Sequence, residues 1–211
     1  MSLGPARRLG GRPTAQASLQ LETTILDAAT TAFLADGYAA TSIETIAKTC
    51  HVAKRTIYTR WNGKPVLFRA VVDRMMTRWL SGAGDWPVAE DLETELNTAA
   101  SRILMVALTP DAIALHRLLI AEGARFPELP HMMHQAGAGQ GTARIKAILD
   151  GAVSRGTLPA ADTAFAAEQF IHLVLAGPQR RALGLGQRLD EAQLGIWQKS
   201  AVTLFLRGVR S

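Results

Sequence analysis

The stretch Thr41–Phe68, TSIETIAKTCHVAKRTIYTRWNGKPVLF, contains two short helical patterns joined by a tight turn, followed by the start of a third helix. Thr41 and Glu44 have the spacing of a capping box, which predicts where the first helix begins. The apolar positions that follow fall on one face of that helix: Ile43, Ile46, Ala47 and Cys50. The pattern stops at His51 and resumes in a second, very short segment.

The second segment, Lys54–Trp61, is apolar at Ile57 and Trp61. Its other positions are cations, hydroxyls and one phenol, namely Lys54, Arg55, Thr56, Tyr58, Thr59 and Arg60. A solvated helix face normally mixes acids with bases, and this one has no acid. The two segments therefore predict a helix-turn-helix whose recognition helix, Lys54–Arg60, lies in the major groove of DNA. A solvated helix with a buried Ile57 is the alternative.

This region resembles the amino-terminal pattern of the tetracycline-repressor (TetR) family of bacterial transcriptional regulators. The matching positions are Gly37-Tyr38, Thr41-Ser42, Ile46-Ala47, Val52, Ile57-Tyr58, Trp61, Lys64 and Leu67-Phe68. The chain departs from the family at His51, where Gly is usual, and at Ala53, where Ser or Thr is frequent. A left-handed His is tolerated less well than Gly, and a missing N-cap hydroxyl costs roughly 1 kcal/mol. Both departures concern local stability.

Positions within this unit assign roles to its polar residues. We expect Lys54 and Arg55 to reach base edges, where a bidentate contact is worth about 1–3 kcal/mol of discrimination. Thr56 and Thr59 would touch bases or phosphates. Tyr58 and Arg60, with Ser42 and Lys64 beside them, would hold the DNA backbone. Phosphate contact by Lys64 is implied by the resemblance. The predicted DNA-binding set is Thr41, Ser42, Lys54, Arg55, Thr56, Tyr58, Thr59, Arg60 and Lys64.

The charge of the chain is concentrated at one end. The net charge is +5, from 23 Lys and Arg against 18 Asp and Glu. Residues 1–70 hold nine bases and four acids, which leaves fourteen of each for residues 71–211. The whole excess thus coincides with the helix-turn-helix pattern, and double-stranded DNA is the partner that it favours. A weakly basic surface without a partner remains the alternative.

The composition excludes several classes of protein. With 48% apolar and 19% charged residues, the 211-residue chain is typical of a globular protein with a sizeable core. The one cysteine, Cys50, fits a reducing compartment and a small buried core position. No CxxC or HExxH spacing occurs, so neither a metal nor a cofactor is expected. No secretory signal or apolar run of membrane-spanning length is evident, which predicts a cytoplasmic protein without membrane contact.

The rest of the chain is helical in pattern, with no strand alternation. We expect an all-α fold of about nine helices, including Ser18–Asp36, 65–80, Leu92–Ala107, Asp111–Phe126, Glu128–Gln135, Thr142–Arg155, Asp162–Ala176 and Asp190–Arg207. The predicted organisation is a basic arm (1–17), a DNA-binding domain (18–64), a connecting helix (65–80) and an effector-binding and dimerisation domain (85–211). In the arm, Arg7, Arg8 and Arg12 would either reach DNA or form a tail with no role.

The segment His116–Gly137 resembles the carboxy-terminal domain of the AefR-like branch of the TetR family. The resemblance rests on Arg117-Leu118, Ala121-Glu122, Arg125–Leu129, Gly156 and Ala167–Phe170. It implies an effector-binding domain for an unknown small molecule. The predicted apolar pocket with a few polar groups comprises Trp79, Trp86, His116, Leu119, Ile120, Arg125, Phe126, Met132 and Met133.

The last two helices carry more large apolar residues than one domain face needs. Two such helices from each of two chains make a four-helix bundle, as the resemblance also implies. The predicted homodimer interface is Phe165, Phe170, Leu173, Val174, Ile196, Trp197, Leu204 and Phe205. The alternative is that these residues are core.

Two other classes of function stay open as alternatives. An enzyme would need a nucleophile and its base, and no GxSxG or comparable signature is present. A helical protein–protein adaptor with a basic end would not read DNA sequence. The favoured function is a ligand-responsive regulator that binds a palindromic operator as a homodimer and is released by its effector. The resemblance implies a repressor, while the residues themselves do not distinguish repression from activation.

Overall fold

The computed structural model describes residues 15–82, 91–159 and 162–210, and within them every regular element is helical. The helices are α1 (Ala15–Ala40), α2 (Ile43–Thr49), α3 (Lys54–Arg60), α4 (Lys64–Gly82), α5 (Leu92–Ala107), α6 (Pro110–Glu122), α7 (Glu128–Met133), the π-helical turn η1 (His134–Ala138), α8 (Gln140–Ser154), α9 (Thr163–Ala182) and α10 (Glu191–Arg210). The expectation of an all-α fold is confirmed, with ten α-helices in these ranges where about nine were expected.

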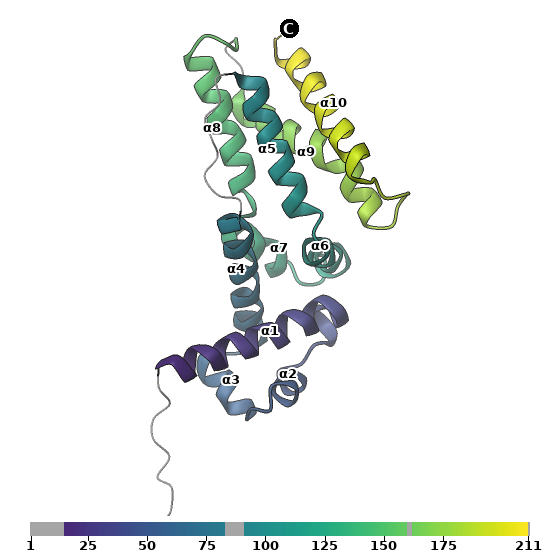
Figure 1. Ribbon diagram of the computed structural model, residues 1–211. Helices are drawn as coiled ribbons and strands as arrows, with labels where there is room; N and C mark the ends of the chain where they lie inside the picture. Colours follow the sequence, from purple (N-terminus) through teal and green to yellow (C-terminus); the bar gives the residue numbers. More distant parts are fainter. Residues whose placement is uncertain (1–14, 83–90, 160–161, 211) are drawn as a thin grey trace, which may run out of the picture.

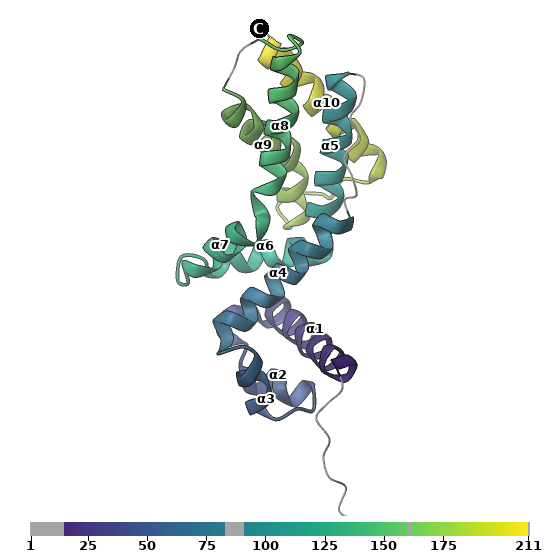
Figure 2. The same cartoon turned by 90° about the vertical axis from the view of Figure 1, so that its left-hand side faces the viewer.

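The helices form two groups at opposite ends of an elongated molecule (Figure 1). Helices α1–α3 form one end, and α5, α8, α9 and α10 form a bundle at the other. Helix α4 runs between the two groups, while α6 and α7 lie at the level where they meet (Figures 1 and 2). The position of α6 between the two groups is the feature of the fold on which the functional argument depends.

The helix-turn-helix has the predicted bounds at α3, with one correction at α2. Ser42, and not Thr41, is the N-cap of α2, because its hydroxyl accepts a hydrogen bond from the N–H of Thr45. His51 adopts the expected left-handed conformation with φ 54°. Ala53 is the N-cap of α3 and makes no side-chain hydrogen bond to the first turn. The stabilisation that a Ser or Thr hydroxyl would give at this position is therefore absent.

A first apolar core joins α1–α4 to α6 and α7. The rings of Phe33, Tyr38, Phe68 and Phe126 lie in contact, with centroids 5.0–5.9 Å apart. Buried residues of α6 and α7 belong to the same core, namely Leu115, Leu118 and Leu129. This core contains residues from both sides of the domain boundary predicted near residue 85, because α6 packs directly on the helix-turn-helix unit.

A second core fills the bundle of α5, α8, α9 and α10. Asp162 caps α9 as expected, and Asp190 and Gln193 form a reciprocal capping box at α10. Between the expected helices Glu128–Gln135 and Thr142–Arg155, η1 and the single turn residue Gly139 lead into α8 at Gln140. Helix α6 ends at Glu122 instead of Phe126, and α9 continues through Pro178 to Ala182.

Among the described residues, no single helix combines the length and apolar content that a membrane span requires. Only α5 and α6 taken together, bent by 72°, satisfy that requirement by length and composition.

Candidate DNA-binding surface and effector cavity

Helix α3 presents a polar face to solvent and buries Ile57 completely. The side chains of Lys54, Arg55, Tyr58 and Thr59 are exposed on that face. Ser42, at the start of α2, is also exposed. These residues share the outer side of the helix-turn-helix, where a duplex would have access to them. Lys48, in the last turn of α2, adds a cation that the sequence-based set omitted.

The cations of this surface form ion pairs of two kinds: weak exposed pairs with Glu44, and a pair between Arg60 and α1. Glu44 lies 3.8 Å from Lys48 and 4.0 Å from Lys54, and all three side chains are more than half exposed. Exposed pairs of this kind contribute about 0–1 kcal/mol, so both lysines remain available to phosphates. Arg60 is different, because its guanidinium bonds Glu22 at 3.3 Å and the hydroxyl of Ser18 at 2.7 Å.

The side chains of two residues of the predicted DNA-binding set bond backbone carbonyls of the protein itself. Thr41 is buried, and its hydroxyl donates to the carbonyls of Ala32 and Gly37. The Nζ of Lys64 donates to three backbone carbonyls, of Tyr38 at 2.7 Å, Ala39 at 3.2 Å and Thr41 at 3.0 Å. Burial lowers the pKa of Lys64, and the nearby Glu122 carboxylate opposes that shift. Both side chains therefore hold the connection between α1 and α2. For the buried Thr41, a side-chain contact with DNA is wrong, whereas phosphate contact by the half-buried Lys64 stays a prediction.

Glu122, the last residue of α6, holds the same connection from the other side. Its two carboxylate oxygens accept hydrogen bonds from the backbone N–H groups of Tyr38 at 2.7 Å and Ala39 at 2.6 Å. Gly37 adopts φ 84° and ψ 169°, and a Cβ on it would lie 2.5 Å from a Glu122 oxygen. The connection between α1 and α2 is thus clamped between a lysine on α4 and a glutamate on α6.

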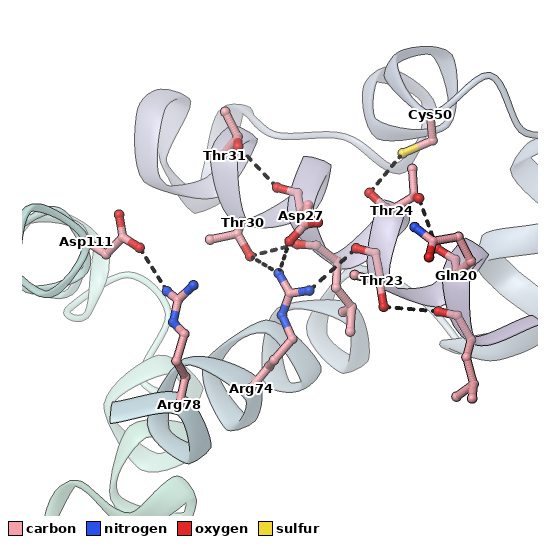
Figure 3. Close-up of polar contacts among 12 residues, drawn as sticks. Gln20, Thr23, Thr24, Asp27, Thr30, Thr31, Cys50, Arg74, Arg78 and Asp111 are labelled. Atoms are coloured by element: carbon pink, nitrogen blue, oxygen red, sulfur yellow. Dashed lines mark hydrogen bonds and ion pairs between the residues drawn. The ribbon is translucent and has the colours of Figure 1, made fainter. Parts of the chain in front are cut away.

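Two arginines on α4 add further links, which Figure 3 shows. Arg74 bonds Asp27 on α1 at 2.7 Å, and Arg78 bonds Asp111 in the first turn of α6 at 3.0 Å. Both arginines extend from the same side of α4, one towards α1 and the other towards α6 (Figure 3). A shift of α6 relative to α4 would therefore strain contacts at both ends of α6.

A cavity of about 300 Å³ lies between α4, α5, α6, α8 and α9. Its described wall is largely apolar, and is formed by Met76, Trp79, Arg102, Ile103, Val106, Ala107, Ala112, Leu115, His116, Leu119, Met133, Gly141, Thr142, Ile171, Leu175 and Gln179. A concave apolar site with few polar groups is the usual form of a small-molecule pocket. Burial lowers the pKa of His116, so its imidazole is neutral at physiological pH.

Part of the predicted pocket lines this cavity. Trp79, His116, Leu119 and Met133 do so. The other described members do not: Ile120 and Arg125 are exposed, Phe126 packs on Tyr38, and Met132 packs against the first core. Trp86 lies outside the described residues. Helical spacing alone does not tell which side of a helix faces the bundle, which explains Ile120 on α6 and Met132 on α7, and Arg125 and Phe126 lie beyond the end of α6.

The opposite wall of the cavity was not predicted from the sequence. It comes from α5, α8 and α9, through residues such as Arg102, Thr142 and Gln179. No local pattern marks these positions, because each is a polar residue among the apolar residues of a core helix. Among the described residues, no group of three or more His, Cys, Asp or Glu could hold a metal ion.

The predicted dimer residues divide into two sets. Phe165, Ile196 and Leu204 are exposed by 60%, 68% and 60%, on the outer sides of α9 and α10. Phe170, Val174 and Phe205 are buried in the second core, so their assignment to an interface is wrong. Leu173 is half-buried against that core.

Trp197 is also held within its own chain. Its indole N–H donates to the carbonyl of Val174 at 3.0 Å, and its ring lies against Gly177. A Cβ on Gly177 would come within 2.3 Å of that ring. Trp197 therefore fixes α10 on α9 and does not project outwards.

The comparisons with known proteins agree with this architecture. Residues 25–71 match the bacterial regulatory proteins of the tetR family, and residues 94–208 match the AefR-like transcriptional repressor C-terminal domain. No curated protein matches the chain in sequence.

Solved structures resemble the chain over most of its length. A TetR-family transcriptional regulator from Mesorhizobium loti MAFF303099 is 28% identical, with a TM-score of 0.77 over 90% of this chain and 97% of the other. The flavonoid-responsive regulator FrrA is 27% identical, with a TM-score of 0.75 over 90% and 96%. The fatty acid degradation regulator FadR from Bacillus halodurans, at 19% identity and a TM-score of 0.68 over 90% and 96%, shares the fold. With its AefR-like carboxy-terminal domain matched over more than half of its length, the chain belongs to the TetR family of transcriptional regulators.

Proposed function

We propose that this protein is a homodimeric, sequence-specific DNA-binding regulator that leaves its operator when a small molecule occupies the cavity. The observation that carries the proposal is the exposed, acid-free face of α3, from Lys54 to Thr59, on a helix-turn-helix. Arg55 is exposed on that face and in the described part of the chain pairs with no acid, so it is suited to a guanine edge.

The route from cavity to DNA runs along α6. His116 and Leu119 line the cavity, and Glu122 follows them at the spacing of one helical turn. Glu122 bonds the connection between α1 and α2, so a displacement of α6 would be transmitted to the helix-turn-helix. A ligand that binds the displaced state more tightly would shift the population away from the DNA-binding state by its difference in affinity.

Exposed apolar side chains on the outer sides of α9 and α10 support the proposed dimer. Phe165, Ile196 and Leu204 leave large apolar side chains exposed there, which is costly in a monomer. A two-fold dimer through these helices would place two α3 helices for successive major grooves, about one helical turn apart. The flavonoid-responsive relative supports a small-molecule effector for this domain arrangement.

Selection of bound duplexes from a random-sequence pool at near-physiological salt tests the proposal. We expect enrichment of an inverted repeat. Arg55→Ala should then relax the preference at one base position in each half-site by about 1–3 kcal/mol. Arg180→Ala, which changes an exposed arginine on α9 outside the helix-turn-helix, is the control and should leave the site preference unchanged.

A different result would support the alternative functions. Weak binding without an enriched sequence, lost at moderate salt, would identify a basic adaptor surface that only contacts phosphates. A second variant, Lys64→Met, distinguishes a lysine that bonds the protein backbone from the exposed lysines Lys48 and Lys54. Because the Nζ of Lys64 bonds three carbonyls, we expect this variant to lose stability without a change in which bases are preferred.

A further inference from the structure

We infer that the cavity takes an uncharged, hydroxylated aromatic compound of one or two rings, recognised by hydrogen bonds from His116, Thr142 and Gln179. This inference rests on the proposed function and specifies the chemical class of its effector. It is argued from three properties of the cavity: its hydrogen-bonding groups, its charge and its walls.

Three neutral hydrogen-bonding side chains of the cavity are available to a ligand. His116, Thr142 and Gln179 come from α6, α8 and α9, and all three are half-buried. Among the described residues, none of their side chains makes a hydrogen bond. A polar group that becomes buried needs a partner, because an unpaired buried one costs about 1–3 kcal/mol. A ligand that covers these three groups is therefore favoured when it supplies hydrogen bonds to them.

The charge of the cavity argues against an ionic ligand. None of its described lining residues is acidic, which leaves a cationic ligand without a counter-ion. Arg102 is the one Lys or Arg in that described lining, and it also interacts with another part of the chain. The imidazole of His116 is neutral, because burial lowers its pKa. A neutral imidazole, a hydroxyl and an amide each both donate and accept, as a ligand hydroxyl does.

The walls of the cavity favour a ring. Trp79 of α4 and the thioether side chains of Met76 and Met133 line it. Sulfur–aromatic and ring–ring contacts add to the burial of apolar area. The volume of about 300 Å³ is at the lower end for ligand pockets, which limits the compound to one or two rings.

Equilibrium dialysis of the full-length protein against four probes with one skeleton tests this inference. The probes are 2-naphthol, naphthalene, 2-naphthoate and 2-naphthylmethylammonium. At neutral pH we expect 2-naphthol to bind most tightly, with the two ions at least about tenfold weaker because burial of an unpaired charge is costly. Tighter or equal binding of either ion would overturn the inference.

Variants assign the preference to the polar groups. His116→Phe keeps the ring shape and removes the hydrogen bond, so 2-naphthol should bind roughly 3- to 10-fold more weakly while naphthalene is unaffected. Thr142→Val, which has the same shape as the native residue, should act in the same direction and guards against a folding defect of the first variant. His172→Phe, at an exposed position of α9 outside the cavity, is the matched control.

The outcomes separate this inference from the proposed function. Loss of 2-naphthol and naphthalene binding in equal measure would show that only the shape of the cavity had changed, and would overturn the role of the polar groups. An enriched operator without 2-naphthol binding would refute the effector class alone. Binding of 2-naphthol without any enriched DNA sequence would refute the regulator alone.

Discussion

The carboxylate of Glu122 accepts a hydrogen bond from the backbone N–H of Tyr38, across 84 residues of sequence and at a distance of 2.7 Å. The second oxygen of the same carboxylate accepts from Ala39 at 2.6 Å. Burial raises the pKa of Tyr38, and the nearby carboxylates of Glu128 and Glu122 raise it further. The effector-side helix α6 is therefore joined to the DNA-binding unit by two charge-assisted hydrogen bonds to its backbone.

We predict that Glu122→Ala lowers the free energy of unfolding by about 1–3 kcal/mol, because the part-buried N–H of Tyr38 and the exposed N–H of Ala39 lose their acceptor. Urea denaturation followed by circular dichroism measures this. Glu168→Gln, at an exposed position of α9, is the control and should change stability by less than about 0.5 kcal/mol. Equal stability of Glu122→Ala and the native protein would show that water replaces the carboxylate without cost.

Gly37 offers an independent check on the same contact. We predict that Gly37→Ala destabilises the protein by more than about 1 kcal/mol, because alanine is strained at φ 84° and its Cβ would overlap a Glu122 oxygen. In the double variant with Glu122→Ala the overlap is gone, so the loss should be smaller than the sum of the two single losses. Strict additivity in a double-mutant cycle would contradict direct contact between the two positions.

How much of this arrangement the sequence could predict depends on the range of the interactions. The bounds of α3, the left-handed His51 and the cap of α9 by Asp162 all follow from neighbouring residues. The contact of Glu122 with Tyr38 does not, because nothing in the sequence around Glu122 distinguishes it from a solvated acid at the end of a helix.

The same limit applies to Thr41 and Lys64. Thr41 precedes Ser42, and either hydroxyl could have capped α2. The resemblance implied phosphate contact by Lys64, and the fold adds three carbonyls at its Nζ that no local pattern predicts. In each case tertiary contacts decided between two roles that are equally compatible with local sequence.

The lowered pKa of His116 predicts how stability depends on pH. The unfolded histidine binds a proton near pH 6.5, and the folded one binds it only at lower pH. Between those two values the unfolded state binds more protons, so the free energy of unfolding falls as the pH falls. We expect His116→Phe to lose less stability than the native protein between neutral pH and pH 5, in urea titrations at each pH.

Other groups that titrate in this range are compared through a second variant. His172→Phe removes an exposed histidine from α9 and should keep the acid sensitivity of the native protein. Parallel pH profiles for the native protein and His116→Phe would show that the proton of His116 is not coupled to folding.

The last prediction concerns the outer sides of α9 and α10. Ile196 and Leu204 lie on α10 with exposures of 68% and 60%, eight residues apart and hence on one side of the helix. We predict that Ile196→Glu and Leu204→Glu each shift the protein from dimer to monomer in sedimentation velocity, because a carboxylate buried at a two-fold axis meets its own copy.

The control is Met105→Glu on α5. Met105 is similarly exposed, at 62%, and this variant should remain a dimer. Affinity for an inverted repeat should fall in the two α10 variants and not in Met105→Glu, whereas binding to a single half-site should be alike in all three. Dissociation of Met105→Glu instead would place the interface on the side of α5 that carries Met105.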